Sequence, residues 1–109
     1  MNLELVNFEK LRNNAEFFKK FDLVIIELVG KLDCIKKIRI AYYDNDRIYI
    51  YFQVTIELDN KKIFIARITD ADRVLITCYS PSEKACSKFT TYIVGINCIS
   101  QHILNNYNS

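Results

Sequence analysis

Arginine and tyrosine side chains gather on one face of a predicted β-sheet, and both residue types suit binding. Four of the five arginines and four of the seven tyrosines occupy odd-numbered positions between residues 38 and 79. Side chains alternate between the two faces of a sheet along each strand. The odd-numbered residues of consecutive strands therefore share one face when the turns between the strands have suitable lengths. Arginine and tyrosine supply energetic anchors at protein interfaces, and they also stack on unpaired bases. We therefore predict an interaction face that includes Arg39, Tyr49, Tyr51, Arg67, Leu75 and Tyr79.

Two functions are compatible with this predicted face. The first is that of a small non-enzymatic protein that binds a protein partner or a second copy of itself. The alternative is single-stranded nucleic-acid binding, with tyrosines stacked on bases and arginines near phosphates. Ile63, Ile65 and Glu57 are expected on the same face, and the formal net charge is only +2. Aliphatic residues and a near-neutral charge favour the protein partner.

An Asp-x-Asp-Arg sequence occurs twice, at residues 44–47 and 70–73. A meander would place both loops at the same end of the sheet, where their carboxylates could hold a hard cation through oxygen ligands. Aspartate is also an ordinary residue of tight turns. We interpret both loops as turns and predict no metal, while a cation site stays an open alternative for Asp44, Asp46, Asp70 and Asp72.

The sequence carries no signature of catalysis or of a cofactor. His102 is the only histidine, and local sequence places no Ser, Cys or carboxylate to work with it. The only two glycines, Gly30 and Gly95, are expected in or beside helices, so no glycine-rich phosphate-binding loop is predicted. The four cysteines lack zinc-type spacing, so we expect small apolar residues, and whether any of them pair stays open. We predict no enzymatic activity, although an active site built from scattered residues is the open alternative.

The chain has 109 residues and a mass of 12.8 kDa. This length predicts a single domain over residues 1–109, in which the polar residues 105–109 are expected to fray. Apolar runs such as Leu23–Ile26 are too short to cross a bilayer, and the N-terminus does not resemble a signal peptide. We therefore expect a cytoplasmic protein that does not contact membranes. Abundant Ile, Lys, Asn and Tyr indicate an AT-rich genome, which suggests a viral, phage or plasmid source.

The elements that must position the interaction face are four predicted strands, in which nearly every even-numbered position between residues 38 and 78 is apolar. Three-residue Asp- and Asn-rich loops preserve the parity between these strands. In this register Tyr42 faces Ile48, Arg39 lies opposite Tyr51, and Arg67 lies between Gln53 and Leu75. The predicted strands cover residues 36–43, 47–58, 62–69 and 73–79.

Two helices are predicted to cover the apolar face of this sheet. An apolar stripe from Phe8 to Leu32 indicates the first, with a possible break near Phe21 and Asp22. The second is expected to begin at Ser80-Pro81-Ser82-Glu83, which resembles a capping box, and to carry an apolar stripe from Cys86 to Ile103. We therefore expect an α+β two-layer sandwich in the order αββββα, a four-stranded antiparallel meander with an N-terminal and a C-terminal helix on one face.

Overall fold

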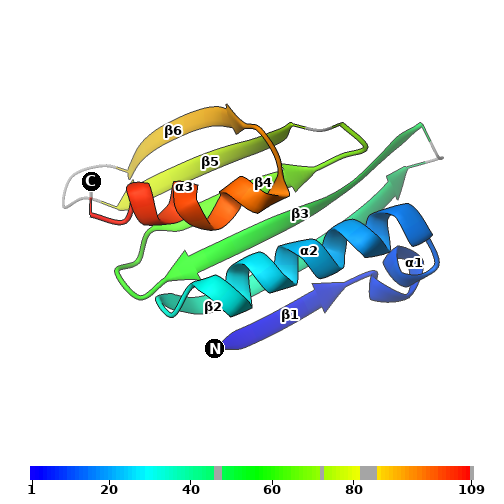
Figure 1. The fold of residues 1–109 in the computed structure, drawn as a ribbon, viewed down its shortest axis with the longest axis horizontal. Coiled ribbons are helices and arrows are strands. Elements are labelled where there is room, and N and C mark those ends of the chain that lie inside the picture. The colour runs from blue at the N-terminus through cyan, green and yellow to red at the C-terminus, as the bar shows by residue number, and fades with distance from the viewer. Residues whose placement is uncertain (46–47, 72, 82–85, 109) are drawn as a thin grey trace.

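The computed structural model describes residues 1–45, 48–71, 73–81 and 86–108. These residues form an α+β fold of two layers, in which helices cover one face of a six-stranded sheet (Figure 1). The short segment η1 is a 3₁₀ helix that leads into the last α-helix. The elements follow the chain in this order: β1 (Asn2–Val6), α1 (Phe8–Arg12), α2 (Ala15–Lys31), β2 (Ile35–Asn45), β3 (Tyr49–Leu58), β4 (Ile63–Ile68), β5 (Val74–Pro81), β6 (Cys86–Ile93), η1 (Ile96–Cys98) and α3 (Ile99–Asn105).

The six strands lie in the sheet in their sequence order. Strands β2 to β6 pair antiparallel, whereas β1 pairs parallel to β2. A parallel pair needs a long connection, and α1 and α2 supply it across the sheet. The predicted α+β class and antiparallel sheet are confirmed, but the four-stranded meander and the order αββββα are wrong because β1 and β6 add a strand at each edge.

The predicted parity of the sheet is confirmed, because even-numbered side chains of β2 to β5 face the helices and form the core. Val54 and Ile76 are completely buried. Ile50 is partly buried and packs against the core. Lys36 and Asp44 near the ends of β2 are exposed, and Ile48, which was predicted to lie in a strand, precedes β3 and has 88% of its surface exposed. The buried members of this set are Ile38, Ile40, Tyr42, Phe52, Val54, Ile56, Leu58, Phe64, Ala66, Ile68, Val74, Ile76 and Cys78.

The register of the first hairpin differs from the prediction. Tyr42 pairs with Phe52 rather than Ile48, and Arg39 pairs with Thr55 rather than Tyr51. At the turn, β2 continues to Asn45 rather than residue 43, and β3 begins at Tyr49 rather than residue 47, which places Phe52 opposite Tyr42 and leaves Ile48 in the turn. The shift is an even number of residues, so the same side chains face the helices. The pairs predicted for the two later hairpins, including Gln53 with Arg67 and Arg67 with Leu75, are confirmed.

The N-terminal helical region is interrupted earlier than the stripe suggested. α1 ends at Arg12, and the Asn14 side chain caps α2 by accepting a hydrogen bond from the Phe17 N–H at 3.3 Å. The buried apolar side chains of α2 are Phe17, Phe21, Val24 and Leu28, whereas Phe18 and Ile25 of the expected stripe are partly buried and pack against the core. No helix of the described ranges, α2 with its 17 residues included, is long and apolar enough to cross a membrane.

The predicted C-terminal helix is mostly wrong. Ser80 and Pro81 end β5, and Cys86–Ile93 forms the edge strand β6. Residues 82–85, including the expected cap residue Glu83, lie outside the described residues. Thr90, Thr91 and Ile93 are β-branched and favour a strand locally. Only the last part of the expected stripe is helical, with Ile99 and Ile103 buried on α3.

Candidate binding surface on the open sheet face

The helices leave one face of the sheet uncovered, and all six residues of the predicted interaction face lie on it. We call this surface the open face, and its register arranges the side chains in rows across the strands. The central row is Glu4, Arg39, Thr55, Ile65, Thr77 and Thr90. One neighbouring row is Ala41, Gln53, Arg67, Leu75 and Tyr92. The row on the other side is Asn2, Lys37, Glu57, Ile63 and Tyr79.

Tyr51 is the centre of a stack of side chains on the open face. The Tyr43 ring is stacked on it with 4.9 Å between centroids and 25° between the ring planes, and the Arg67 guanidinium lies 4.6 Å from the Tyr51 centroid. Tyr43 comes from β2 and Arg67 from β4, which flank β3 on opposite sides. Both ring faces of Tyr51 are therefore occupied. Tyr49 meets the Tyr51 ring edge-on at 5.1 Å and is itself half exposed.

The stack continues into a pocket of about 580 Å³ on the open face. Tyr49, Arg67 and Leu75 line it, together with Arg73 and Tyr92. Tyr92 is 62% exposed, so much of its ring is accessible. Three of the six predicted residues therefore line one hollow, to which Arg73 adds a second guanidinium group and Tyr92 a second phenol ring.

Arg39 and Tyr79 lie on the same face but outside this pocket. The Arg39 guanidinium lies 3.5 Å from a Glu4 carboxylate oxygen, and Lys37 approaches the other Glu4 oxygen at 3.6 Å. Tyr79 lies opposite Ile63, in the outer row. The structure thus places Arg39 in an ion-pair cluster at the β1 edge, where it shares one carboxylate with Lys37.

The charges of the open face are balanced unevenly. Among the described residues, neither Arg67 nor Arg73 has a carboxylate within 4 Å, and Glu57 has no cationic group within that distance. Arg67 is held by the Tyr51 ring rather than by an acid. A guanidinium oriented in this way keeps its donors available for a carboxylate or phosphate.

Sequence reasoning missed three residues that shape this surface. Tyr43 was placed on the face but not in the site, although it stacks on Tyr51. Tyr92 was assigned to a helix, and no element was predicted for the segment that contains Glu4. The alternation of Leu3, Glu4 and Leu5 was a signal for β1, but five residues are too few to stand out.

The two aspartate-rich loops, the cysteines and His102 are the other candidates for chemistry. Asp46 and Asp72 lie outside the described residues, and within the described ranges no group of three or more potential ligands gathers around a metal position. Cys34, Cys78 and Cys98 are free thiols. His102 packs edge-on to Phe64, and burial lowers the pKa of its imidazole. Its Nε2 atom is buried and has no hydrogen-bond partner among the described residues.

Comparisons with known proteins add no family or relative. No protein-family model, no curated protein and no solved structure matches this chain. The functional argument therefore depends on the geometry of the open face.

Proposed function

We propose that this chain is a small non-enzymatic binding protein that associates with a second copy of itself through the open face. The stack of Tyr43, Tyr51 and Arg67 is the observation that carries this proposal. It presents a rigid aromatic and guanidinium surface, the composition found at the energetic centres of protein interfaces. Ile63, Ile65 and Leu75 add half-buried aliphatic surface that a packed partner would cover.

The size of the open face suits a dimer. Five spacings of about 4.8 Å make the sheet about 24 Å wide, and a ten-residue strand such as β3 is about 33 Å long. The resulting area of roughly 800 Å² matches the ≈ 800 Å² per partner that a standard interface buries. A pair of sheets packed in this way forms a sandwich.

The charges of the open face are complementary to those of a second copy. In a two-fold arrangement, each contact between residue i and residue j occurs twice. Arg67 and Glu57 both lack an opposite charge within 4 Å among the described residues, so they can meet reciprocally across the dimer. A separate protein partner would need an acidic group for Arg67 in the same place.

Light scattering over a concentration series tests this proposal. We expect the mass to rise from monomer toward dimer between low and high micromolar concentration. Leu75→Glu should keep the protein monomeric, because it places a charge in the middle of the interface. The new carboxylate lies opposite Arg67 within the same sheet, so the fold should be retained.

The matched control is Leu104→Glu, because Leu104 is exposed on α3 on the other side of the sheet. This variant should dimerise like the original chain. A monomer at the highest concentration, or equal dimerisation of both variants, would contradict self-association through the open face. If the chain stays monomeric at the highest concentration, binding of a different protein through the open face is the hypothesis that remains to be tested.

The pocket favours a second candidate, single-stranded nucleic-acid binding. Arg67 and Arg73 could contact phosphate, while the exposed rings of Tyr49 and Tyr92 could stack on bases. The occupied faces of Tyr51 count against it, since a base would have to displace Tyr43 or Arg67. This candidate predicts binding of an unpaired oligonucleotide that weakens steeply with salt and is lost in Tyr92→Ala. Weak binding that is insensitive to salt would exclude it.

A further inference from the structure

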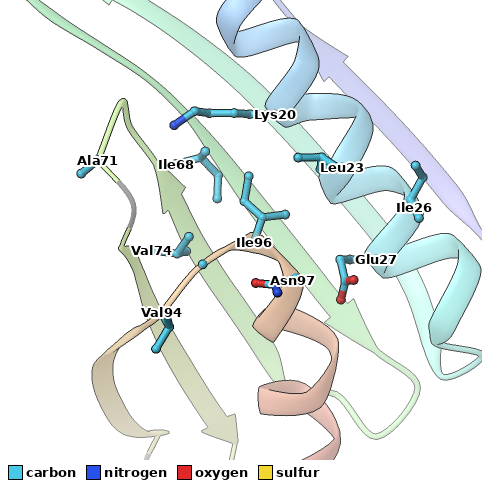
Figure 2. A pocket seen from close by; sticks show the side chains of 11 residues that line it. Lys20, Leu23, Ile26, Glu27, Ile68, Ala71, Val74, Val94, Ile96 and Asn97 are labelled. Atoms are coloured by element: carbon cyan, nitrogen blue, oxygen red, sulfur yellow. The ribbon is translucent and has the colours of Figure 1, made fainter.

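A second hollow lies on the opposite side of the sheet, in the helical layer, and the proposed function does not use it. It has a volume of about 570 Å³, within the usual range of small-molecule pockets. α2 forms one wall, and the segment from Val94 to Asn97 forms the other (Figure 2). We call this hollow the helical-side groove.

Aliphatic side chains make up most of the helical-side groove. Leu23 and Ile96 approach each other from α2 and η1, and Ile68 and Val74 lie beside them on β4 and β5 (Figure 2). Val94 stands at the rim with 80% of its surface exposed. Leaving this much apolar surface in water is unfavourable, so an apolar ligand would gain free energy by covering it.

The two polar ends of the groove differ in their charge balance. At one end, the Lys20 ammonium donates one hydrogen bond to the Thr69 carbonyl at 2.8 Å and has no carboxylate within 4 Å among the described residues. An ammonium has three N–H donors, so two stay available. At the other end, Glu27 accepts hydrogen bonds from Lys31 and Ser100, each at 2.5 Å. The groove therefore offers an unbalanced positive charge at the Lys20 end, while the negative charge of Glu27 is already matched.

We infer that the helical-side groove binds a small anionic amphiphile, a carboxylate with a medium-length aliphatic chain. The carboxylate would pair with Lys20, and the chain would lie along Leu23, Ile96 and Val94. Lys20 and Glu27 are seven residues apart, or about 10.5 Å along the helix axis. This distance limits the aliphatic part to a medium-length chain, because a longer one would reach the Glu27 carboxylate.

Calorimetric titration with octanoate below its critical micelle concentration tests this inference. We expect octanoate to bind, and octyltrimethylammonium, with the same chain and the opposite charge, to bind at least tenfold more weakly. Affinity should rise roughly fourfold per added methylene up to the length of the groove, the factor expected for burial of one CH₂ group. Failure of octanoate to bind, or equal binding of the two amphiphiles, would overturn the inference.

A pair of lysine variants locates the site. Lys20→Met should lower octanoate affinity about tenfold, since it removes a charge-assisted hydrogen bond while keeping the chain length. Lys19→Met, on the exposed side of the same helix, should leave the affinity unchanged. Equal effects of the two substitutions would overturn the assignment of Lys20.

Methyl NMR gives a readout that does not depend on a variant. Octanoate should shift the signals of Val94 and Ile96 and leave Leu75 of the open face unchanged. Shifts confined to Leu75 would place the ligand on the wrong side of the sheet and overturn the inference. The dimerisation test uses variants of the open face only, so the two proposals fail independently.

Discussion

Glu27 is a charged residue inside the helical layer, with only 5% of its surface exposed. It joins two helices, because Lys31 on α2 and the Ser100 hydroxyl on α3 both donate to its carboxylate. Burial acts to raise the pKa of Glu27, but the hydrogen bonds from Lys31 and Ser100 outweigh it and hold the pKa below its ordinary value. The carboxylate therefore stays ionised and hydrogen-bonded in the folded protein.

Removing this carboxylate should destabilise the fold. Glu27→Ala leaves the buried Ser100 hydroxyl without its acceptor, and we expect the free energy of unfolding to fall by about 2 kcal/mol. Glu27→Gln keeps an acceptor for Ser100 and should cost less than half as much. Urea denaturation measures both variants, and equal losses would show that the hydrogen bond to Ser100 is unimportant.

His102 should make stability depend on pH. Burial lowers the pKa of its imidazole in the folded state, so the unfolded chain binds a proton more readily. The contribution of the neutral His102 imidazole to stability is fully present above the unfolded-state pKa of about 6.5. It is lost as the pH falls through the folded-state pKa. Urea midpoints measured on either side of that pH should show the decrease, and His102→Phe should abolish it. An unchanged pH profile in the variant would contradict this role.

At the scale of elements, Asn14 fixes where α2 begins. Its side chain accepts a hydrogen bond from the Phe17 N–H and donates to the Tyr42 hydroxyl at 3.2 Å. Asn14→Ala should reduce the free energy of unfolding by about 1 to 2 kcal/mol, the usual cost of losing an N-terminal cap. Asn13→Ala, at the preceding exposed position, is the control and should change little. Thermal denaturation of the two variants distinguishes them.

Hydrogen exchange tests whether β6 is a strand. At a sheet edge, alternate N–H groups point toward the neighbouring strand and the others point outward. We therefore expect alternating slow and fast amide exchange along Cys86–Ile93. Continuous protection of successive amides would instead indicate a helix and contradict the strand.

The elements also show how far the sequence could be interpreted. It was predictable that the even-numbered residues of β2 to β5 face the core, because the apolar alternation runs through four strands and every turn between them preserves it. The strand β6 was not predictable, and a helix was expected in its place. Phe89, Ile93 and Ile96 have helical spacing by coincidence, while Thr90 and Thr91 favour a strand. β1 was missed for a different reason, since it needs the partner β2 to form its ladder and gives only a short pattern alone.

At the scale of the whole molecule, the sheet separates two surfaces with different chemistry. The open face carries aromatic rings and guanidinium groups, whereas the helical side carries an aliphatic groove with Lys20 at one end. All six predicted site residues are at odd-numbered positions, so the alternation of side chains along the strands was enough to place them on the open face. Their grouping could not be predicted, because it depends on the first-hairpin register that stacks Tyr43 on Tyr51 and on Tyr92 of the unforeseen strand β6.

Isotope-filtered NMR on a mixture of labelled and unlabelled chains tests the self-association proposal most directly. At a concentration where light scattering detects the dimer, we predict intermolecular NOEs between methyl groups of Ile63, Ile65 and Leu75 and protons of the second copy. Intermolecular NOEs only from the helical side, such as from Val94 or Leu104, would contradict association through the open face.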